Sequence, residues 1–237
     1  GEIKALVNDH QGHPIEFPLL EIQSKSQNET FQNIVLKLND YDWAIFISSN
    51  AVQFGMPAVK HAFHTLPEST KFAAIGPSTQ KALKLFDVNH VLIPDENFDS
   101  EGLLATEEMN DIKNKKIVIF RGEGGRETLA ETLRARGAEV TYAECYTRTF
   151  PQTNLDLLKT FSEKIHISAI LITSSEACKE FIRLNRLKDM SFLKDVLFIV
   201  NHPRMVNVLE RESFMTFSSD EPSDQSMMKK LLETIDH

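Results

Sequence analysis

The amino-acid sequence contains an internal repeat, and this repeat restricts the possible architecture more than any other feature. When the chain is displaced by about 126 residues, the segment SSNA at 48–51 falls on SSEA at 174–177, and each segment directly follows an apolar run. Residues 99–100 fall at the same displacement on residues 225–226, and each pair opens an amphipathic helical pattern. A near-constant offset over most of the chain predicts two similar structural units.

Short apolar runs alternate with helical patterns along both units. Continuous runs of Val, Ile and Phe indicate strands that are buried on both faces, as in a parallel sheet. Helical patterns cover residues 80–86 and 128–136, and the second stops at Gly137. This alternation predicts an α/β fold of two similar doubly wound parallel-sheet domains, flavodoxin-like or Rossmann-like in type. The expected strands lie at residues 43–48, 72–76, 91–94, 116–122, 139–146, 167–173 and 196–200.

The repeat leaves one expected strand without a counterpart. Near the N-terminus the displacement is 125 residues, and Gly1 then aligns with Arg126, which already begins a helical pattern, so the strand at 116–122 has no match in the first half. The repeat therefore predicts that a strand and its turn, roughly a dozen residues, are missing before Gly1.

The composition argues against several classes of function. The 237 residues include 26 Lys and Arg against 34 Asp and Glu, which leaves no basic surface for a nucleic-acid duplex or a membrane surface. The apolar runs are much shorter than a membrane span. Cys145 and Cys178 form no CxxC pair, so we expect neither a disulfide framework nor a zinc site. We therefore expect a cytoplasmic protein that binds neither nucleic acid nor membrane.

Four small polar loops follow expected strands, at residues 48–50, 76–79, 121–126 and 173–175. Doubly wound sheets bind ligands outside the carboxyl ends of their strands, where hydroxyls and free N–H groups at helix N-termini favour phosphate or carboxylate. In any one loop the Ser or Thr is more simply explained as a helix cap. Four such loops together favour an anion-binding cleft between two domains. The candidate binding residues are Ser48, Ser49, Asn50, Gly76, Ser78, Thr79, Arg121, Gly122, Gly125, Arg126, Thr173, Ser174, Ser175 and Arg204.

The glycine loop GEGGRE at 122–127 is neither a GxGxxG fingerprint nor a P-loop, so it gives little support for nucleotide binding. Arg121 ends a strand and could point into the cleft. Arg126 lies at a helix start, where a cation is unfavourable unless it serves an anionic ligand. A plain salt bridge with a nearby acid is the alternative.

The remaining reactive side chains give one candidate. His61 and His64 lack further ligands at metal spacing, so we interpret them as a solvated pair and expect no bound metal. Cys178 is expected to be a buried helix residue, and no serine lies in a GxSxG elbow. Tyr146 ends the run at 139–146, where it could pack, or could face the cleft and donate a proton.

Five segments resemble the uroporphyrinogen-III synthase family. They occur in the family's order and cover nearly the whole chain: IFISSNAV (45–52), AIGPSTQKAL (74–83), EGLL (101–104), the segment at 117–148, and ILITSSEA (170–177). The most specific pattern is RGxGGRExLxxxLxxxGAxVxxxxxYxR, which is similar to bacterial members. Two features differ. The family's opening strand, which ends in Thr-Arg-Pro, is lacking, and residues 200–204, the counterpart of the loop at Gly76, contain no glycine.

The resemblance implies two α/β domains joined by a two-stranded antiparallel ladder. Residues 17–23 and 143–150 match the two linker strands. One domain would then combine residues 1–17 with 150–237, and the other would span residues 24–142.

The resemblance also implies a lyase of tetrapyrrole and haem biosynthesis that acts without metal or organic cofactor, as a monomer. Such an enzyme converts linear hydroxymethylbilane into uroporphyrinogen III, with loss of water and inversion of ring D. Tyr146 matches the family tyrosine that is thought to assist the leaving hydroxyl. The competing hypotheses are a non-catalytic two-domain protein that binds a small anion, and a nucleotide-sugar transferase, for which the loops supply no nucleotide site.

Overall fold

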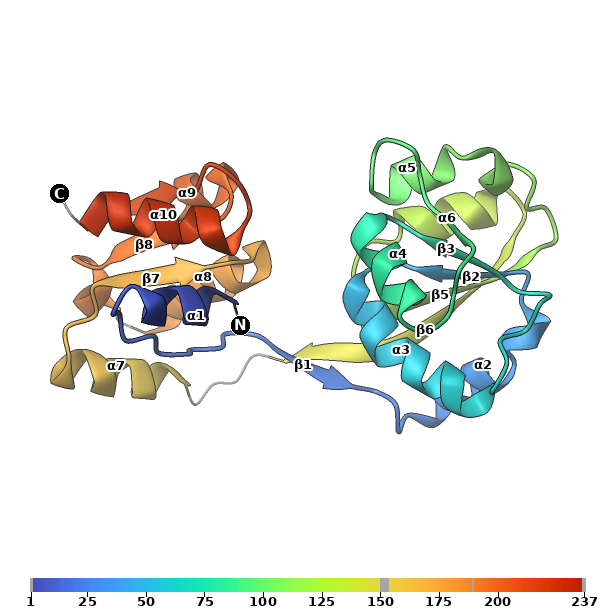
Figure 1. The fold of residues 1–237 in the computed structure, drawn as a ribbon, viewed down its shortest axis with the longest axis horizontal. Coiled ribbons are helices and arrows are strands. Elements are labelled where there is room, and N and C mark those ends of the chain that lie inside the picture. The colour runs from blue at the N-terminus through green and yellow to red at the C-terminus, as the bar shows by residue number, and fades with distance from the viewer. Residues whose placement is uncertain (1, 150–153, 189, 236–237) are drawn as a thin grey trace. The chain divides into compact units, whose positions relative to one another are not determined.

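The chain folds into two compact units. The computed structural model describes residues 2–149, 154–188 and 190–235. Unit 1 comprises Gly1–Glu21 with Thr149–His237, and unit 2 comprises Ile22–Arg148. The chain passes from unit 1 to unit 2 within strand β1 (Glu21–Ser24) and returns at the end of strand β6 (Glu139–Thr149) (Figure 1).

The sheet of unit 2 has the strand order β1-β6-β5-β2-β3-β4. The pairs β6–β5, β5–β2, β2–β3 and β3–β4 are all parallel. The chain adds β3 and β4 on one side of β2, and β5 and β6 on the other, so the sheet is doubly wound about its centre. The strands are β2 (Trp43–Phe46), β3 (Lys71–Ala74), β4 (Val91–Leu92) and β5 (Lys116–Gly122).

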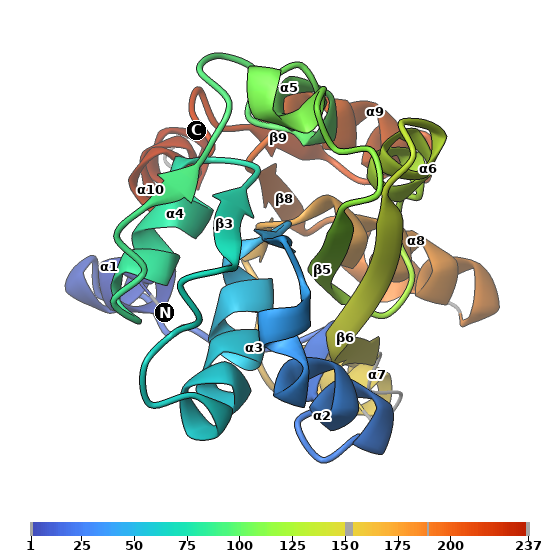
Figure 2. The ribbon, with the colours of Figure 1, turned by 90° about the vertical axis from the view of Figure 1, so that its right-hand side faces the viewer.

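Helices cover both faces of this sheet because its strands are apolar on both sides. Ala44 and Phe46 face α2, α3 and α4, whereas Trp43 and Ile45 face α5 and α6. Figure 2 shows α5 and α6 above the sheet and α2 and α3 below it. The helices are α2 (Glu29–Leu36), α3 (Ser49–Ala62), α4 (Pro77–Lys84), α5 (Ser100–Leu104) and α6 (Thr128–Ala135).

Aromatic packing holds the strands of unit 2 against α2 and α3. The rings of Phe46 on β2 and Phe120 on β5 stack at 4.3 Å between centroids. Phe31 of α2 meets Phe120 edge-on at 6.4 Å. All three rings are buried, so this core fixes the two central strands, and with them the loops that follow.

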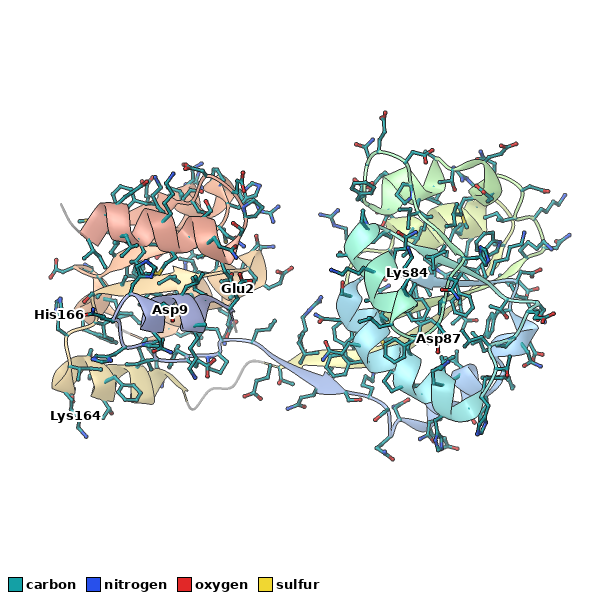
Figure 3. The ribbon with its side chains drawn as sticks, viewed as in Figure 1. Glu2, Asp9, Lys84, Asp87, Lys164 and His166 are labelled. Atoms are coloured by element: carbon teal, nitrogen blue, oxygen red, sulfur yellow. The ribbon has the colours of Figure 1, made fainter. Side chains whose placement is uncertain are left out.

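Unit 1 has its own parallel sheet and its own core. Phe198 packs toward α8 and α9, and Ile199 packs toward α10 and α1. The backbone N–H of Ile3 donates to Asp224 at 2.9 Å, which ties α1 to α10. Figure 3 labels Glu2 and Asp9 at the two ends of α1. The elements are α1 (Glu2–Asp9), α7 (Asn154–Lys164), β7 (Ala169–Ile172), α8 (Ser175–Leu187), β8 (Leu197–Val200), α9 (Pro203–Glu210), β9 (Thr216–Ser218) and α10 (Asp224–Ile235).

The structure confirms the α/β class, the parallel sheets and all seven strands expected from the apolar runs. It also confirms the central correspondence of the repeat. Ser48 and Ser174 each follow a parallel strand, and each caps a helix by accepting from a backbone N–H at 3.1 Å. In the described part of unit 1 the strand order is β7-β8-β9, which matches β2-β3-β4. There β7 lies at the sheet edge, whereas β2 lies between β5 and β3.

Two details differ from the sequence analysis. The strand expected at residues 17–23 is the shorter β1, whose Glu21–Ser24 pair with β6. The three-residue strand β9 was not expected, because a run as short as Thr216–Ser218 gives no periodic signal.

Candidate active site

The polar loops of unit 2 meet where the winding of its sheet reverses. β2 and β5 are parallel neighbours, so the loops after Phe46 and after Gly122 leave the same sheet edge. The first leads to α3 on one face and the second to α6 on the other. This divergence opens the sheet edge at the position where doubly wound proteins bind ligands. It gathers Ser48, Ser49, Asn50, Gly122, Gly125 and Arg126.

Tyr146 lies against this edge because of a register shift. Along β5 and β6 the pairing runs one to one as far as Arg121 with Glu144, and then Gly122 pairs with Tyr146. A Cβ atom on Gly122 would lie 2.5 Å from Cε2 and 2.6 Å from Cζ of the Tyr146 ring. The ring therefore occupies the space that any other residue at position 122 would need for its side chain.

Among the residues that the structure describes, two polar side chains contact the hydroxyl of Tyr146. Its oxygen lies 3.5 Å from Oγ of Ser48, and Nη2 of Arg148 donates to it at 3.3 Å. The ring is 1% exposed and lies 5.7 Å from that of Phe54. Tyr146, Ser48 and Gly122 thus meet at the switch point of the sheet, although the sequence places them far apart.

Arg121 shapes the glycine loop from inside. Its guanidinium is buried, and Nε donates to the carbonyl of Gly122 at 3.2 Å. Nη2 donates to the carbonyl of Gly124, and Nη1 lies 3.0 Å from Oε1 of Glu127. The bonds to Gly122 and Gly124 hold a loop in which Gly124 has φ +71°. Arg121 thus points into the loop, and its direct binding of a ligand stays a prediction.

Tyr142 contacts both Arg121 and Glu127, and these three side chains together are called the Arg121 brace. Its ring lies 4.5 Å from the guanidinium carbon of Arg121, and its hydroxyl donates to Oε2 of Glu127. The hydrogen bond from Tyr142, together with the charge of Arg121, lowers the pKa of the Glu127 carboxyl. Burial and the neighbouring carboxylate raise the pKa of Tyr142. Tyr142 therefore keeps its proton and donates it in the hydrogen bond to Glu127.

Arg126 differs from Arg121. It is exposed, and it forms no hydrogen bond or ion pair with any other residue that the structure describes. The salt bridge that the sequence left open for Arg126 is thus not observed within this part of the chain. A cation at the start of α6 is unfavourable for the helix dipole, which favours an anionic ligand as its partner.

The loop after β3 adds a third helix start to the same edge of unit 2. Gly76 caps α4 with Pro77 at its first position, and a Cβ on Gly76 would lie 3.1 Å from Cβ of Phe98. Ser78 is exposed on the first turn, whereas Thr79 is buried in the helix. Direct binding by Thr79 stays a prediction.

Unit 1 presents a comparable set of groups at its own strand ends. Ser174 caps α8, and Nε of Arg204 donates to Oγ of Ser175 at 3.1 Å. Asn201 donates to the carbonyl of Thr173 at 2.6 Å, which joins the loops after β7 and β8. Sequence reasoning omitted Asn201, although its place between a strand and Pro203 was an available signal.

Cys145, Cys178, His61 and His64 lie outside the polar loops described above. The Cys145 thiol donates to the carbonyls of Arg121 and Ala51, and burial raises its pKa to about 12. Cys178 is buried on α8, as expected. His61 lies in the last turn of α3, and His64 lies beyond the end of that helix. Within the described ranges no cluster of three or more His, Cys, Asp or Glu could hold a metal.

A cavity of about 430 Å³ in unit 1 is lined by residues 179–187 of α8 and by Val208 of α9. Three of its lining residues are apolar and three are cations. Of the cations, Arg183 is paired with Glu180 and Arg186 with Glu212. This cavity is a poorer anion site than the loops are.

Taken alone, the fold and the loops define a class of protein: a doubly wound α/β protein with helix N-termini and hydroxyls at the carboxyl ends of its parallel strands. The family model described as "Uroporphyrinogen-III synthase HemD" matches residues 1–229. The chain belongs to the uroporphyrinogen-III synthase family, which confirms the resemblance seen in the sequence.

Curated relatives agree. A uroporphyrinogen-III synthase of Proteus mirabilis is 34% identical over 138 residues, which are 58% of this chain and 69% of the relative. One from Escherichia coli (strain K12) is 36% identical over 132 residues, 56% of this chain. That match spans 54%, about half, of the E. coli protein's length.

Solved structures support the fold. A uroporphyrinogen III synthase of Thermus thermophilus matches with a TM-score of 0.62 at 16% identity, covering 98% of this chain and 94% of that one. One from Helicobacter pylori 26695 matches with a TM-score of 0.60 at 15% identity, covering 91% and 90%. Among the residues described, no helix combines the length and apolar character needed to cross a membrane.

The brace predicts that lysine cannot replace Arg121. One ammonium group cannot reach the acceptors on Gly122, Gly124 and Glu127 together. We expect Arg121→Lys to lower the free energy of unfolding by about 1–3 kcal/mol, because the buried carbonyl of Gly122 and the carbonyl of Gly124 lose their donor. Arg134→Lys is the matched control, since Arg134 is exposed and also lies over the Tyr142 ring, at 5.3 Å. We expect it to change stability by less than about 0.5 kcal/mol. Equal losses in urea titrations would contradict the brace.

Proposed function

We propose that this chain is a uroporphyrinogen-III synthase, which converts linear hydroxymethylbilane into cyclic uroporphyrinogen III with release of water. The observation that carries the proposal is the Tyr146 hydroxyl, seated over Gly122 and beside Ser48 at the switch point of the sheet. Membership of the family supplies the substrate and the product.

The reaction begins when the terminal hydroxymethyl group loses its oxygen. The C–O bond breaks with its electron pair on oxygen, and the pyrrole nitrogen supplies electrons to the carbon, which gives an azafulvenium cation. The substituted carbon of ring D then attacks this centre to form a spiro intermediate, which fragments and recloses with ring D inverted. The protein has two tasks: to hold a flexible chain in a cyclising shape and to assist the departing oxygen.

Tyr146 is the proposed proton donor to that oxygen. A phenol is protonated at neutral pH, so it can act as a general acid without activation by a metal. Its 1% exposure means that the substrate must approach past Ser48 or Arg148, the polar groups that contact the hydroxyl. The proton ends in the water that is released.

The loops are the proposed carboxylate sites. Backbone N–H groups and hydroxyls at the starts of α3, α4 and α6 can each bind one carboxylate, and Arg126 supplies a cation beside them. In unit 1 the starts of α8 and α9, with Ser175 and Arg204, offer the same chemistry. Binding divided among separate small sites explains how a protein of net charge −8 can hold a polyanion.

We also propose the discontinuous domain arrangement, with residues 1–17 and 150–237 in one domain, residues 24–142 in the other, and 17–23 and 143–150 as the linker ladder. The division of the chain near Glu21 and Arg148 supports this arrangement. We propose further that the protein acts as a monomer in the cytoplasm. Its buried thiols, Cys145 and Cys178, fit a reducing compartment.

The experiment that tests the function compares wild type with Tyr146→Phe. Wild type should convert hydroxymethylbilane into the type III isomer. Tyr146→Phe should lower kcat by roughly 10²–10⁴-fold, the usual scale for general acid catalysis, with an unchanged melting temperature. Tyr41→Phe is the matched control. Formation of only the spontaneous type I isomer by wild type would leave the anion-binding alternative. Full activity in Tyr146→Phe would end the role of proton donor.

The close contact between the Tyr146 ring and Gly122 gives a second prediction. Gly122→Ala places a methyl group within 2.6 Å of two Tyr146 ring atoms, so the ring must move. Gly55→Ala is the control, because its Cβ would lie 2.8 Å from the Phe120 ring, away from Tyr146. Both variants should lose about 1–3 kcal/mol of stability through overpacking. Only Gly122→Ala should lose type III formation per folded molecule. Equal specific activities of the two variants would show that the contact between Gly122 and the Tyr146 ring is unimportant for activity.

A further inference from the structure

Arg148 stands beside the hydroxyl of Tyr146 and is the more exposed of its two polar neighbours. It lies two residues further along β6, and alternate residues of a strand share a face. Nη2 of Arg148 donates to the Tyr146 oxygen at 3.3 Å, and the guanidinium carbon lies 5.5 Å from the ring centroid. Tyr146 is buried, while Arg148 is exposed.

The direction of these hydrogen bonds determines where the phenol proton can point. A guanidinium group has only donors, so the Tyr146 oxygen must accept from Arg148. The phenol hydrogen is therefore left for Ser48 or for a ligand. The distance to Oγ of Ser48 is 3.5 Å, a weak contact, and that oxygen already accepts from the N–H of Ala51 at 3.1 Å.

The second tyrosine of β6 shows the opposite arrangement. Tyr142 also lies near arginines, but its hydroxyl donates to the carboxylate of Glu127. The hydrogen bond to Glu127 therefore already uses the phenol hydrogen of Tyr142. Among the described residues no carboxylate is hydrogen-bonded to Tyr146, whose proton is free for transfer.

We propose that Arg148 is a positioning residue for the proton transfer from Tyr146. It keeps the phenol oxygen as an acceptor, so that the phenol hydrogen points to the leaving oxygen. It also stabilises the negative charge that develops on the phenol oxygen as the proton leaves. This inference rests on the proposed function and adds to it a residue that acts through Tyr146.

The step balances in atoms and charge. The C–O bond breaks with its electron pair on the leaving oxygen, and the proton of Tyr146 completes a water molecule. The pyrrole nitrogen supplies electrons to the carbon, leaving an azafulvenium cation and a phenolate paired with Arg148. The phenolate regains its proton when the cyclised intermediate loses one to restore the aromatic pyrrole.

A double-mutant cycle tests this inference. We would measure kcat and KM for type III formation in wild type, Arg148→Gln, Tyr146→Phe and the double variant. Arg148→Gln should lower kcat by about 10–100-fold, the scale of a hydrogen bond to a charged group, with little change in KM. Arg148→Lys should recover part of the loss. In the Tyr146→Phe background, Arg148→Gln should cause no further loss, because the group it acts on is gone.

Arg134→Gln is the control, because Arg134 is exposed and lies over Tyr142 instead. It should leave kcat unchanged. Multiplicative losses in the cycle, or a rise in KM alone, would overturn the inference and identify Arg148 as an independent carboxylate ligand at most. Wild type without any type III product would overturn the proposed function and this inference with it. An active wild type with independent losses would overturn this inference alone.

Discussion

The close approach of the Tyr146 ring to the backbone of Gly122 is the contact on which the candidate site depends. Two local features produce it: the register shift between β5 and β6, and the absence of a side chain at position 122. The shift brings Tyr146 opposite Gly122, the last residue of β5. Because Gly122 has no side chain, the Tyr146 ring packs directly against its backbone. The hydroxyl then comes within reach of Ser48, whose loop leaves the neighbouring strand β2.

The surrounding core and loops hold this contact in place. The stacked rings of Phe46 and Phe120 fix β2 against β5, and so fix the distance between the loops that follow them. The guanidinium of Arg121 holds the glycine loop by the carbonyl groups of Gly122 and Gly124, and the N–H of Glu123 ties the loop to the carbonyl of Tyr146 at 2.8 Å. Rigid support of this kind is what general acid catalysis requires, because the donor must already point at the atom it protonates.

Much of the fold could be predicted from the sequence. Continuous apolar runs marked the strands, and the repeat paired the loops at Ser48 and Ser174, since both signals are local. The place of Tyr146 at the end of a strand made it a candidate, and the family resemblance pointed to the same residue. The inward direction of Arg121 was not predictable, because it depends on carbonyls and a carboxylate that converge only after folding. The spacing of two residues places Arg148 on the same strand face as Tyr146, but its hydrogen bond to the phenol oxygen is seen only in the structure.

The central claim is that the phenol of Tyr146 gives its proton to the departing oxygen. The most direct test replaces Tyr146 alone with fluorotyrosines, whose phenols become more acidic with each added fluorine, and measures kcat for type III formation across pH. If Tyr146 must be protonated to act, the alkaline fall in kcat should move to lower pH with each step in phenol acidity. An alkaline limb that stays in place through the series would show that the proton comes from another group.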